Sequence, residues 1–351
     1  MPSRPWGADT VSTAPPLFEV AGLAFFAALA VTPLARRLAR ATGYMDHPDP
    51  RKAHAQATPL LGGVAIAAAL LAAWALARVI GVSTIGAPSM GLLAGALIAL
   101  AVGLIDDRHP LGPRGKLLGQ FAAGACLVWW GTRVPELRVN PLLGLVALVG
   151  VATLMNAINF LDNMDGILGA LVPVTSGGFV ALALVHGAPV HLALAWGLIG
   201  ACAGFLVYNA PPAKIFLGDA GSHLLGFALA ALALQSLEQS FTFPHVAAVF
   251  MILAYPVFDV TFVTLDRVIG HRPFYVGSID HTTHRLGTLF GRWGTMGIVT
   301  LATSVNALLG VWIWGCSDPL SITAVLCVSG LGYALFGTLL RHISPTTQFV
   351  T

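Results

Sequence analysis

The sequence predicts an all-α, polytopic integral membrane protein. Three observations point to this class: 56% of the 351 residues are apolar, only 9% are charged, and the mean hydropathy is +0.81. A water-soluble fold of this length could not hide so much apolar surface from water. Apolar stretches long enough to cross a bilayer also recur along the whole chain.

The apolar stretches give the expected number of membrane helices, because a bilayer core about 30 Å thick needs roughly 20 residues per helical span. Eleven stretches qualify, and ten is the alternative, since the fifth can be merged with its polar neighbour. They cover residues 18–36, 60–80, 87–105, 116–131, 141–158, 167–186, 190–208, 222–237, 244–265, 295–315 and 319–340. The expected domains are a short extracytoplasmic arm (1–17), a single transmembrane domain (18–340) and a short cytoplasmic tail (341–351).

The positions of lysine and arginine predict the orientation, since short cytoplasmic loops retain these residues and translocated loops do not. With the loop after the first stretch placed inside, 14 of the 18 basic residues lie in the cytoplasm. The N-terminus is then expected outside and the C-terminus inside. The net charge of +3 reflects this bias and does not indicate nucleic-acid binding. Residues 1–17 lack the pattern of a cleavable signal peptide, so the first span is expected to serve as the signal.

Carboxylates near the inner membrane face are the strongest functional signal. Asp106 and Asp107 end the third stretch, Asp162 and Asp165 follow the fifth, and Asp219 precedes the eighth. A carboxylate near lipid costs roughly 2.5 to 3.5 kcal/mol. Any one of these residues could be a helix cap or a surface charge. Five of them on one face, from three distant segments, predict a polar site at that face.

Clustered carboxylates repel one another unless a cation joins them, and hard oxygen ligands beside a phosphate suit Mg²⁺ or Mn²⁺. The segment from Gly218 to Ser222 adds a tight glycine turn that presents Asp219. We expect Ser222 to cap the helix that follows. The N–H groups at the start of that helix would face the cluster, and a helix N-terminus is a ready site for phosphate oxygens.

These residues lie within five stretches that resemble the polyprenyl-phosphate N-acetylhexosamine-1-phosphate transferases, a superfamily within glycosyltransferase family 4. The stretches occur in the family's order and cover nearly the whole chain. They are Arg51-Lys52-Ala53-His54 with Thr58-Pro59 and Gly62-Gly63; Asp106-Asp107 through Lys116-Leu117-Leu118-Gly119-Gln120; Asn156 through Gly166; Asn209 through Ser222; and Asp280-His281-Thr282-Thr283-His284-Arg285-Leu286.

The resemblance implies a role for each polar group, in an active site formed by the cytoplasmic loops. The implied residues are Asp106, Asp107 and Lys116 for catalysis at the acceptor phosphate; Asp219 and Asp162 for the metal ion; Asn159, Asp162, Asp165 and Asn209 for the nucleotide; and His281, His284 and Arg285 for the diphosphate and sugar. The implied cofactor is Mg²⁺, with Mn²⁺ as the alternative.

The implied reaction transfers a sugar phosphate from a UDP-N-acetylhexosamine to undecaprenyl or another polyprenyl phosphate and releases UMP. A polyprenyl phosphate lies at the membrane and a UDP-sugar is cytosolic, so only a site at their boundary meets both. The resemblance thus implies a multi-pass protein of the cytoplasmic (inner) membrane, with its active site facing the cytoplasm, that starts cell-envelope glycan synthesis. A homodimer is compatible with the sequence, and no nucleic-acid partner is expected.

Thr283 stands where the family often has a third histidine, so this motif does not determine which sugar is transferred. The stretch from Lys116 to Gln120 and the missing histidine favour the N-acetylglucosamine-1-phosphate branch over the phospho-N-acetylmuramoyl-pentapeptide transferases. Two readings from other classes remain as alternatives. A membrane prenyltransferase also uses aspartate-rich Mg²⁺ motifs, but it has no use for the loop at Gly218. A cation-coupled transporter would show internal repeats or broken helices, and no convincing repeat is visible.

Overall fold

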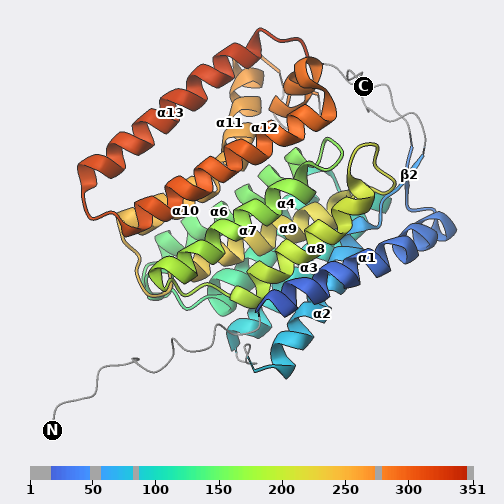
Figure 1. Cartoon of the computed structure of the whole chain (residues 1–351), viewed down its shortest axis with the longest axis horizontal. Coiled ribbons are helices and arrows are strands. Elements are labelled where there is room, and N and C mark those ends of the chain that lie inside the picture. Colours follow the sequence, from blue (N-terminus) through green and yellow to red (C-terminus); the bar gives the residue numbers. More distant parts are fainter. Residues whose placement is uncertain (1–16, 48–56, 82–86, 273–278, 346–351) are drawn as a thin grey trace.

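The computed structural model describes residues 17–47, 57–81, 87–272 and 279–345. Apart from one short antiparallel pair of strands, the secondary structure in these residues is helical (Figure 1). The elements are α1 (Leu17–Thr42), β1 (Met45–Asp46), β2 (Thr58–Pro59), α2 (Gly62–Val79), α3 (Ala87–Arg108), α4 (Gly112–Cys126), the π-helical turn η1 (Leu127–Gly131), α5 (Pro135–Val139), α6 (Pro141–Leu161), α7 (Ile167–His186), α8 (Leu192–Asn209), α9 (Gly218–Ser236), α10 (Phe243–Ile252), α11 (Ala254–Ile269), α12 (Thr282–Gly315) and α13 (Pro319–Arg341).

The predicted all-α, multi-pass class is confirmed. Within the described ranges, eight helices are long and apolar enough to cross a membrane, or nine if the bent pair α10 and α11 counts as one span. All eleven predicted stretches lie in helices, and the segment 141–158 forms its own candidate span as part of α6. The stretches 116–131 and 222–237 correspond to α4 with η1 and to α9, which are not among the eight. The count of eleven spans and the orientation of the termini stay predictions.

Two predicted spans have a different shape from the one expected. The stretch 244–265 is not one straight helix, because α10 and α11 meet at Leu253 with a bend of 73°. The stretch 295–315 is the second part of α12, which begins thirteen residues earlier at Thr282 and is interrupted at Gly291, where φ is 63°. The motif at His281 to Arg285 therefore forms the first turn of a helix.

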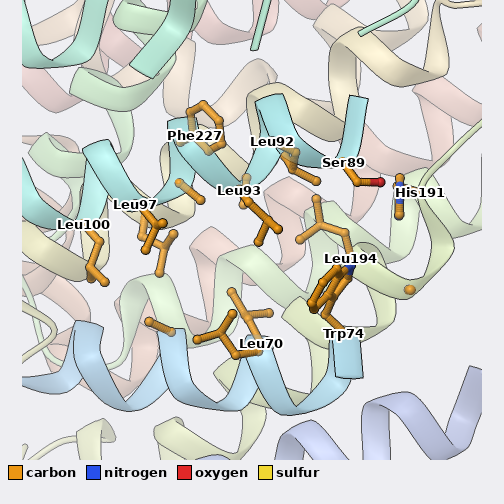
Figure 2. A pocket seen from close by; sticks show the side chains of 16 residues that line it. Leu70, Trp74, Ser89, Leu92, Leu93, Leu97, Leu100, His191, Leu194 and Phe227 are labelled. Carbon is orange, nitrogen blue, oxygen red and sulfur yellow. The ribbon is translucent and has the colours of Figure 1, made fainter. Parts of the chain in front are cut away.

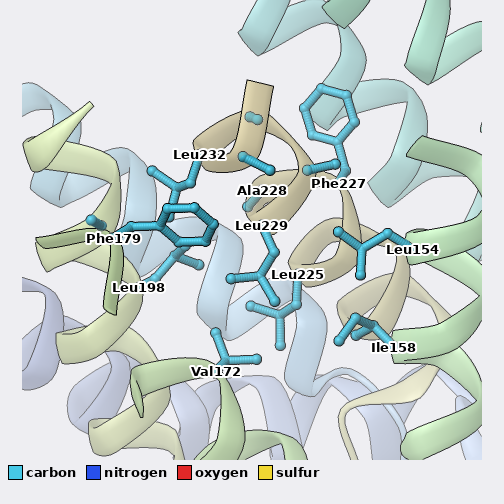
Figure 3. Close-up of a cluster of buried hydrophobic side chains, with 14 of the residues drawn as sticks. Leu154, Ile158, Val172, Phe179, Leu198, Leu225, Phe227, Ala228, Leu229 and Leu232 are labelled. Carbon is cyan, nitrogen blue, oxygen red and sulfur yellow. The ribbon is translucent and has the colours of Figure 1, made fainter. Parts of the chain in front are cut away.

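Helix α9 is the centre of the bundle, and nearly all of its residues are buried. It packs against α2, α3, α6 and α7. Figure 3 shows Leu225, Leu229 and Leu232 of α9 among apolar side chains of α6, α7 and α8. Helices α10 to α13 lie on one side of this bundle and α1 with α2 on the other (Figure 1). This packing holds α9, and with it the N-terminus of the helix, in a fixed position within the bundle.

The loop before α9 is held by the start of α2. Backbone amides of Gly62 and Gly63 donate to the carbonyls of Phe216 and Leu217, at 3.0 and 2.8 Å. A Cβ at Gly63 would lie 2.2 Å from the backbone nitrogen of Gly221, so only glycine allows α2 to approach α9 this closely. The Gly62-Gly63 stretch and the Lys214–Ser222 stretch are thus two sides of one contact.

An apolar cavity of about 110 Å³ lies between α2, α3, α8 and α9 (Figure 2). Leu97 and Leu100 lie at one end of it, and Trp74, Ser89 and His191 gather at the other. The cavity exists because α2 and α3 both pack on α9 but barely touch each other. Its lining carries no carboxylate, so it is separate from the polar site described next.

Candidate active site

Lys116 is the electrostatic centre of the site. Its Nζ lies 2.6 Å from Asp106 Oδ2, at the end of α3, and 2.6 Å from Asp219 Oδ2, in the first turn of α9. The three side chains come from three helices, so the tertiary fold brings them together. One ammonium placed between two carboxylates offsets their repulsion, and the pairs are only partly exposed, which limits screening by water.

Asp107 caps helix α9 from outside that helix. Its Oδ1 accepts the backbone N–H of Asp219 at 2.8 Å, and its Oδ2 accepts that of Ala220 at 3.1 Å. The prediction that Ser222 caps the helix is wrong, because α9 already begins at Gly218. Ser222 lies in the second turn and accepts a hydrogen bond from Asn159. The expected free N–H groups at this helix start are thus satisfied by a protein carboxylate.

Gly218 makes this cap possible. Its φ is +73°, in the left-handed region that favours glycine. A Cβ at this position would lie 2.6 Å from the carbonyl oxygen of Leu60 and 2.7 Å from Asp107 Oδ2. Any other residue would therefore push Asp107 away from the helix start.

A network of neutral polar side chains supports Asp219 from behind. Asn159 Nδ2 donates to Asp219 Oδ1 at 2.7 Å, and the ring Nδ1 of His223 lies 2.7 Å from the Asp219 carbonyl. Gln120 connects the other ring nitrogen of His223, at 3.0 Å, to the side-chain amide of Asn156. Buried polar groups of this kind are stable only when they are satisfied, and here they fix the position of Asp219.

Asp162, at the end of α6, has a partly exposed carboxylate without a hydrogen-bond donor in the described ranges. Desolvation, and then the negative charges of Asp219, Asp107 and Asp165, raise its pKa well above the usual range. A bound divalent cation would relieve this repulsion. No three histidine, cysteine or acidic side chains of the described residues form a complete metal cage. Mg²⁺, however, is commonly held by one or two carboxylates with water and substrate phosphates, and Asp219 with Asp162 fits that requirement.

The two other predicted nucleotide residues join neighbouring loops. Asp165 Oδ2 accepts from Arg292 of α12 at 2.8 Å and from the Ala213 amide at 3.0 Å. Asn209 accepts from the backbone of Gly166 and donates to the carbonyl of Ile215. Both side chains hold the loop after α6 against the loop before α9. Their predicted contact with the nucleotide stays a prediction.

His281 lies at the start of α12 and is paired with Asp259, with Nδ1 2.8 Å from Oδ2. Its ring packs edge-on against Phe160, with centroids 5.8 Å apart. The next motif residue, Thr283, donates to Asn163 at 2.6 Å. The first turn of α12 thus docks on the loop that carries Asp162, and the threonine that replaces the family's histidine makes part of that contact.

His284 and Arg285 are buried in the first turn of α12. Arg285 forms an ion pair with Asp266 at 3.1 Å and donates to the backbone carbonyls of Leu340, Arg341 and Ile343 at the end of α13. The structure therefore brings His281 to the loop after α6, whereas the guanidinium of Arg285 holds α12 to α13. The expected contact of Arg285 and His284 with substrate stays a prediction.

Sequence reasoning missed several members of the site. Asp259 carried a visible signal, a carboxylate in the middle of an apolar stretch, but received no role. His223 and Arg292 carried no signal in the sequence, because a single histidine or arginine is usually a packing or surface residue. The stretch Arg51-Lys52-Ala53-His54 lies outside the described residues.

Comparisons with known proteins show the family, and the matched family profile covers three of the five motif stretches. The profile of Glycosyl transferase family 4 matches residues 89–237, from the start of α3 to the end of α9. A Bacillus subtilis protein named "Probable undecaprenyl-phosphate N-acetylglucosaminyl 1-phosphate transferase" is 33% identical over 74% of this chain and 74% of its own length. The "Decaprenyl-phosphate N-acetylglucosaminephosphotransferase" of Mycolicibacterium smegmatis is 36% identical over 62% of this chain and 60% of its own length.

A second kind of relative is also present. The "Phospho-N-acetylmuramoyl-pentapeptide-transferase" of Symbiobacterium thermophilum is 33% identical over 77% of this chain and 88% of its own length. The matched profile contains Asp106, Lys116, Asn159 and Asp219, which the fold gathers at one end of α9. The chain therefore belongs to glycosyl transferase family 4, in the branch that includes the polyprenyl-phosphate N-acetylglucosamine-1-phosphate transferases.

Proposed function

We propose that this transferase moves N-acetylglucosamine-1-phosphate from UDP-N-acetylglucosamine to undecaprenyl phosphate or another polyprenyl phosphate, and releases UMP. The observation that carries the proposal is the placement of Lys116 between Asp106 and Asp219 at the N-terminus of the central helix. Such an arrangement suits a reaction that brings several phosphate charges together. The names of the Bacillus and Mycolicibacterium relatives supply the sugar and the lipid.

In the proposed reaction an oxygen of the lipid phosphate attacks the sugar-side phosphorus of the UDP-sugar, and the bond to UMP breaks. Lys116 is the nearest described cation to Asp219 and can pair with phosphate oxygens. Asp106 accepts from Lys116 and from the Leu111 amide, and so orients the ammonium. Both oxygens of Asp107 accept backbone N–H groups at the start of α9, so we assign it to holding Asp219.

Mg²⁺, or Mn²⁺ in its place, would be held by Asp219 and Asp162 and would neutralise charge on the transferred phosphoryl group. Asn159 keeps one Asp219 oxygen in a fixed direction, which is the support that a metal-binding carboxylate requires. The cytoplasmic orientation of this end of the bundle and a location in the inner membrane are parts of the proposal. A homodimer remains a prediction.

The phospho-N-acetylmuramoyl-pentapeptide transferases are the second candidate, because one relative carries that name. Both reactions use the same lipid phosphate and release UMP, so the charged centre does not separate them. Membership of family 4 argues against the prenyltransferase and the transporter. The bend between α10 and α11 does not revive the transporter, because a broken helix alone shows no coupled transport.

The test supplies purified full-length protein with undecaprenyl phosphate and Mg²⁺, and with either UDP-N-acetylglucosamine or UDP-N-acetylmuramoyl-pentapeptide. We expect UMP and a lipid-linked sugar diphosphate from the first donor. Release of UMP from the second donor alone would assign the protein to the phospho-N-acetylmuramoyl-pentapeptide transferases. UDP or inorganic diphosphate as the product would exclude the proposed reaction.

A further inference from the structure

Asp259 is a fully buried carboxylate on α11, outside the five motif stretches. Its Oδ2 lies 2.8 Å from His281 Nδ1. Its Oδ1 accepts the backbone N–H of Thr282 at 3.0 Å and the hydroxyl of the same residue at 2.5 Å. A buried charge is costly unless it is paired and hydrogen-bonded. All the donors of Asp259 come from the start of α12, so its position is tied to His281.

The directions of these hydrogen bonds follow from the donor inventory. An ionised carboxylate only accepts, so the hydroxyl proton of Thr282 and the Nδ1 proton of His281 both point to Asp259. Tyr255, whose hydroxyl lies 3.1 Å from the Thr282 hydroxyl, must then donate to it. This chain fixes His281 with its proton on Nδ1. Nε2 is therefore the ring nitrogen left to meet another group, and it has no hydrogen-bond partner in the described part of the chain.

The surroundings of His281 connect it to the candidate active site. Phe160, which contacts the ring, directly follows Asn159, the residue that binds Asp219. Thr283 binds Asn163, in the same loop as Asp162. The imidazole thus lies between Asp259 on α11 and the loop after α6. A histidine whose Nδ1 is held by a carboxylate presents Nε2 in a fixed direction, and its imidazolium form has a counter-charge.

We propose that Asp259 is a positioning residue for the proposed transfer: it holds Nδ1 of His281 so that Nε2–H of the protonated ring donates to an oxygen of the donor diphosphate. The inference rests on the proposed function and deepens it. Asp259 itself does not touch substrate. It carries the counter-charge of the imidazolium and stops the ring from turning.

Asp259→Asn tests this with little change in shape. The amide can still accept from Thr282, but its NH₂ group then faces Nδ1, which must give up its proton and become an acceptor. The ring then no longer has a carboxylate counter-charge beside Nδ1. We expect kcat to fall about 10- to 100-fold, below the ~10⁴ seen when the orienting aspartate of a serine-protease triad is made neutral. KM for polyprenyl phosphate should stay the same.

Two variants of His281 separate positioning from structure. His281→Asn keeps a donor near Nδ1 for Asp259 but has no counterpart of Nε2, so we expect it to lose as much activity as His281→Ala. Adding Asp259→Asn to His281→Asn should then cause no further loss, because both changes remove the same function. Thr303→Val, farther along α12, is the matched control: it removes a buried hydroxyl that donates to the Val299 carbonyl, and it should leave activity within a few-fold whatever its effect on thermal stability.

The inference is overturned if His281→Asn is active, if the losses from the two sites multiply, or if Thr303→Val lowers kcat as much as Asp259→Asn. ¹⁵N NMR of the histidine-labelled full-length protein gives a readout that does not depend on turnover. We expect Nδ1 of His281 to be protonated in the wild type and unprotonated in Asp259→Asn. If the wild type released no UMP, the proposed function would fail, and this spectrum would still decide whether Asp259 sets the protonation of the ring.

Discussion

Asp107 on α3 accepts the backbone N–H of Asp219 on α9, at 2.8 Å, and thereby couples the two aspartates through a helix start. We expect Asp107→Ala to cost about 1 kcal/mol of folding free energy, as for the loss of other N-terminal caps. Activity should fall by more than this loss of stability explains, because Asp219 loses its fixed position. Melting temperature and UMP release measured on the same sample check both effects.

Asp318 provides a matched control for this prediction. It caps α13 through the amides of Leu320 and Ser321, far from the candidate site. Asp318→Ala should lower the melting temperature and leave UMP release per folded molecule unchanged. Equal losses of activity in the two variants would show that Asp107 has no special connection to the site.

The pair of Lys116 and Asp219 should show strong coupling. Asp219→Asn is nearly isosteric, so we expect an inserted, folded protein with activity reduced at least ~10²- to 10³-fold, the scale for losing one electrostatic stabiliser of a transition state. Lys116→Met leaves Asp106 and Asp219 without their common cation and should lower the melting temperature. Adding Asp219→Asn to Lys116→Met should restore part of that loss, and a purely additive result would contradict the arrangement.

The repulsion at Asp162 predicts a metal-dependent stability. A carboxyl group whose pKa is raised in the folded state lowers the stability of that state, and this cost grows as the pH rises from the ordinary aspartate pKa to the raised one. Asp162→Asn should therefore raise the melting temperature in metal-free buffer, with a larger gain at higher pH. Mg²⁺ should stabilise the wild type more than this variant. An equal response to Mg²⁺ in both would remove Asp162 from the metal site.

Much of the site follows from sequence, because motif residues at the ends of apolar stretches must meet if those ends share one membrane face. Asp106, Lys116, Asn159 and Asp219 do meet. The sequence does not predict which oxygen of each carboxylate accepts from which donor. The cap that Asp107 gives to α9 depends on how α3 packs beside it, and no local pattern distinguishes that use from metal binding.

The fold, like the site, can be predicted from the sequence only in part. Hydropathy predicts where helices run, since burial in lipid requires a continuous apolar stretch. It does not predict the bend at Leu253 or the interruption at Gly291, because both halves of each helix remain apolar. Arg285 illustrates the limit for single residues: its motif does not predict that its guanidinium donates to the carbonyls at the end of α13.

The orientation can be tested with single cysteines in a chain whose four native cysteines are replaced by alanine. Arg114 and Val139 are exposed and lie on loops or helix ends at opposite sides of the membrane in the predicted topology. Arg114→Cys should react with an impermeant thiol reagent only from the cytoplasm, and Val139→Cys only from outside. Labelling of Arg114→Cys from outside would put the candidate site on the wrong face for a cytosolic nucleotide.

The central claim, a direct exchange between two phosphoanhydrides, is tested most directly by running the reaction backward. One such bond breaks and another forms, so the equilibrium constant should lie within about a decade of unity, where a decade is roughly 1.4 kcal/mol. Purified protein, the lipid-linked N-acetylglucosamine diphosphate, Mg²⁺ and labelled UMP should yield labelled UDP-N-acetylglucosamine, and Asp219→Asn should slow both directions together. Efficient forward transfer with no label passing from UMP into the UDP-sugar would contradict the account.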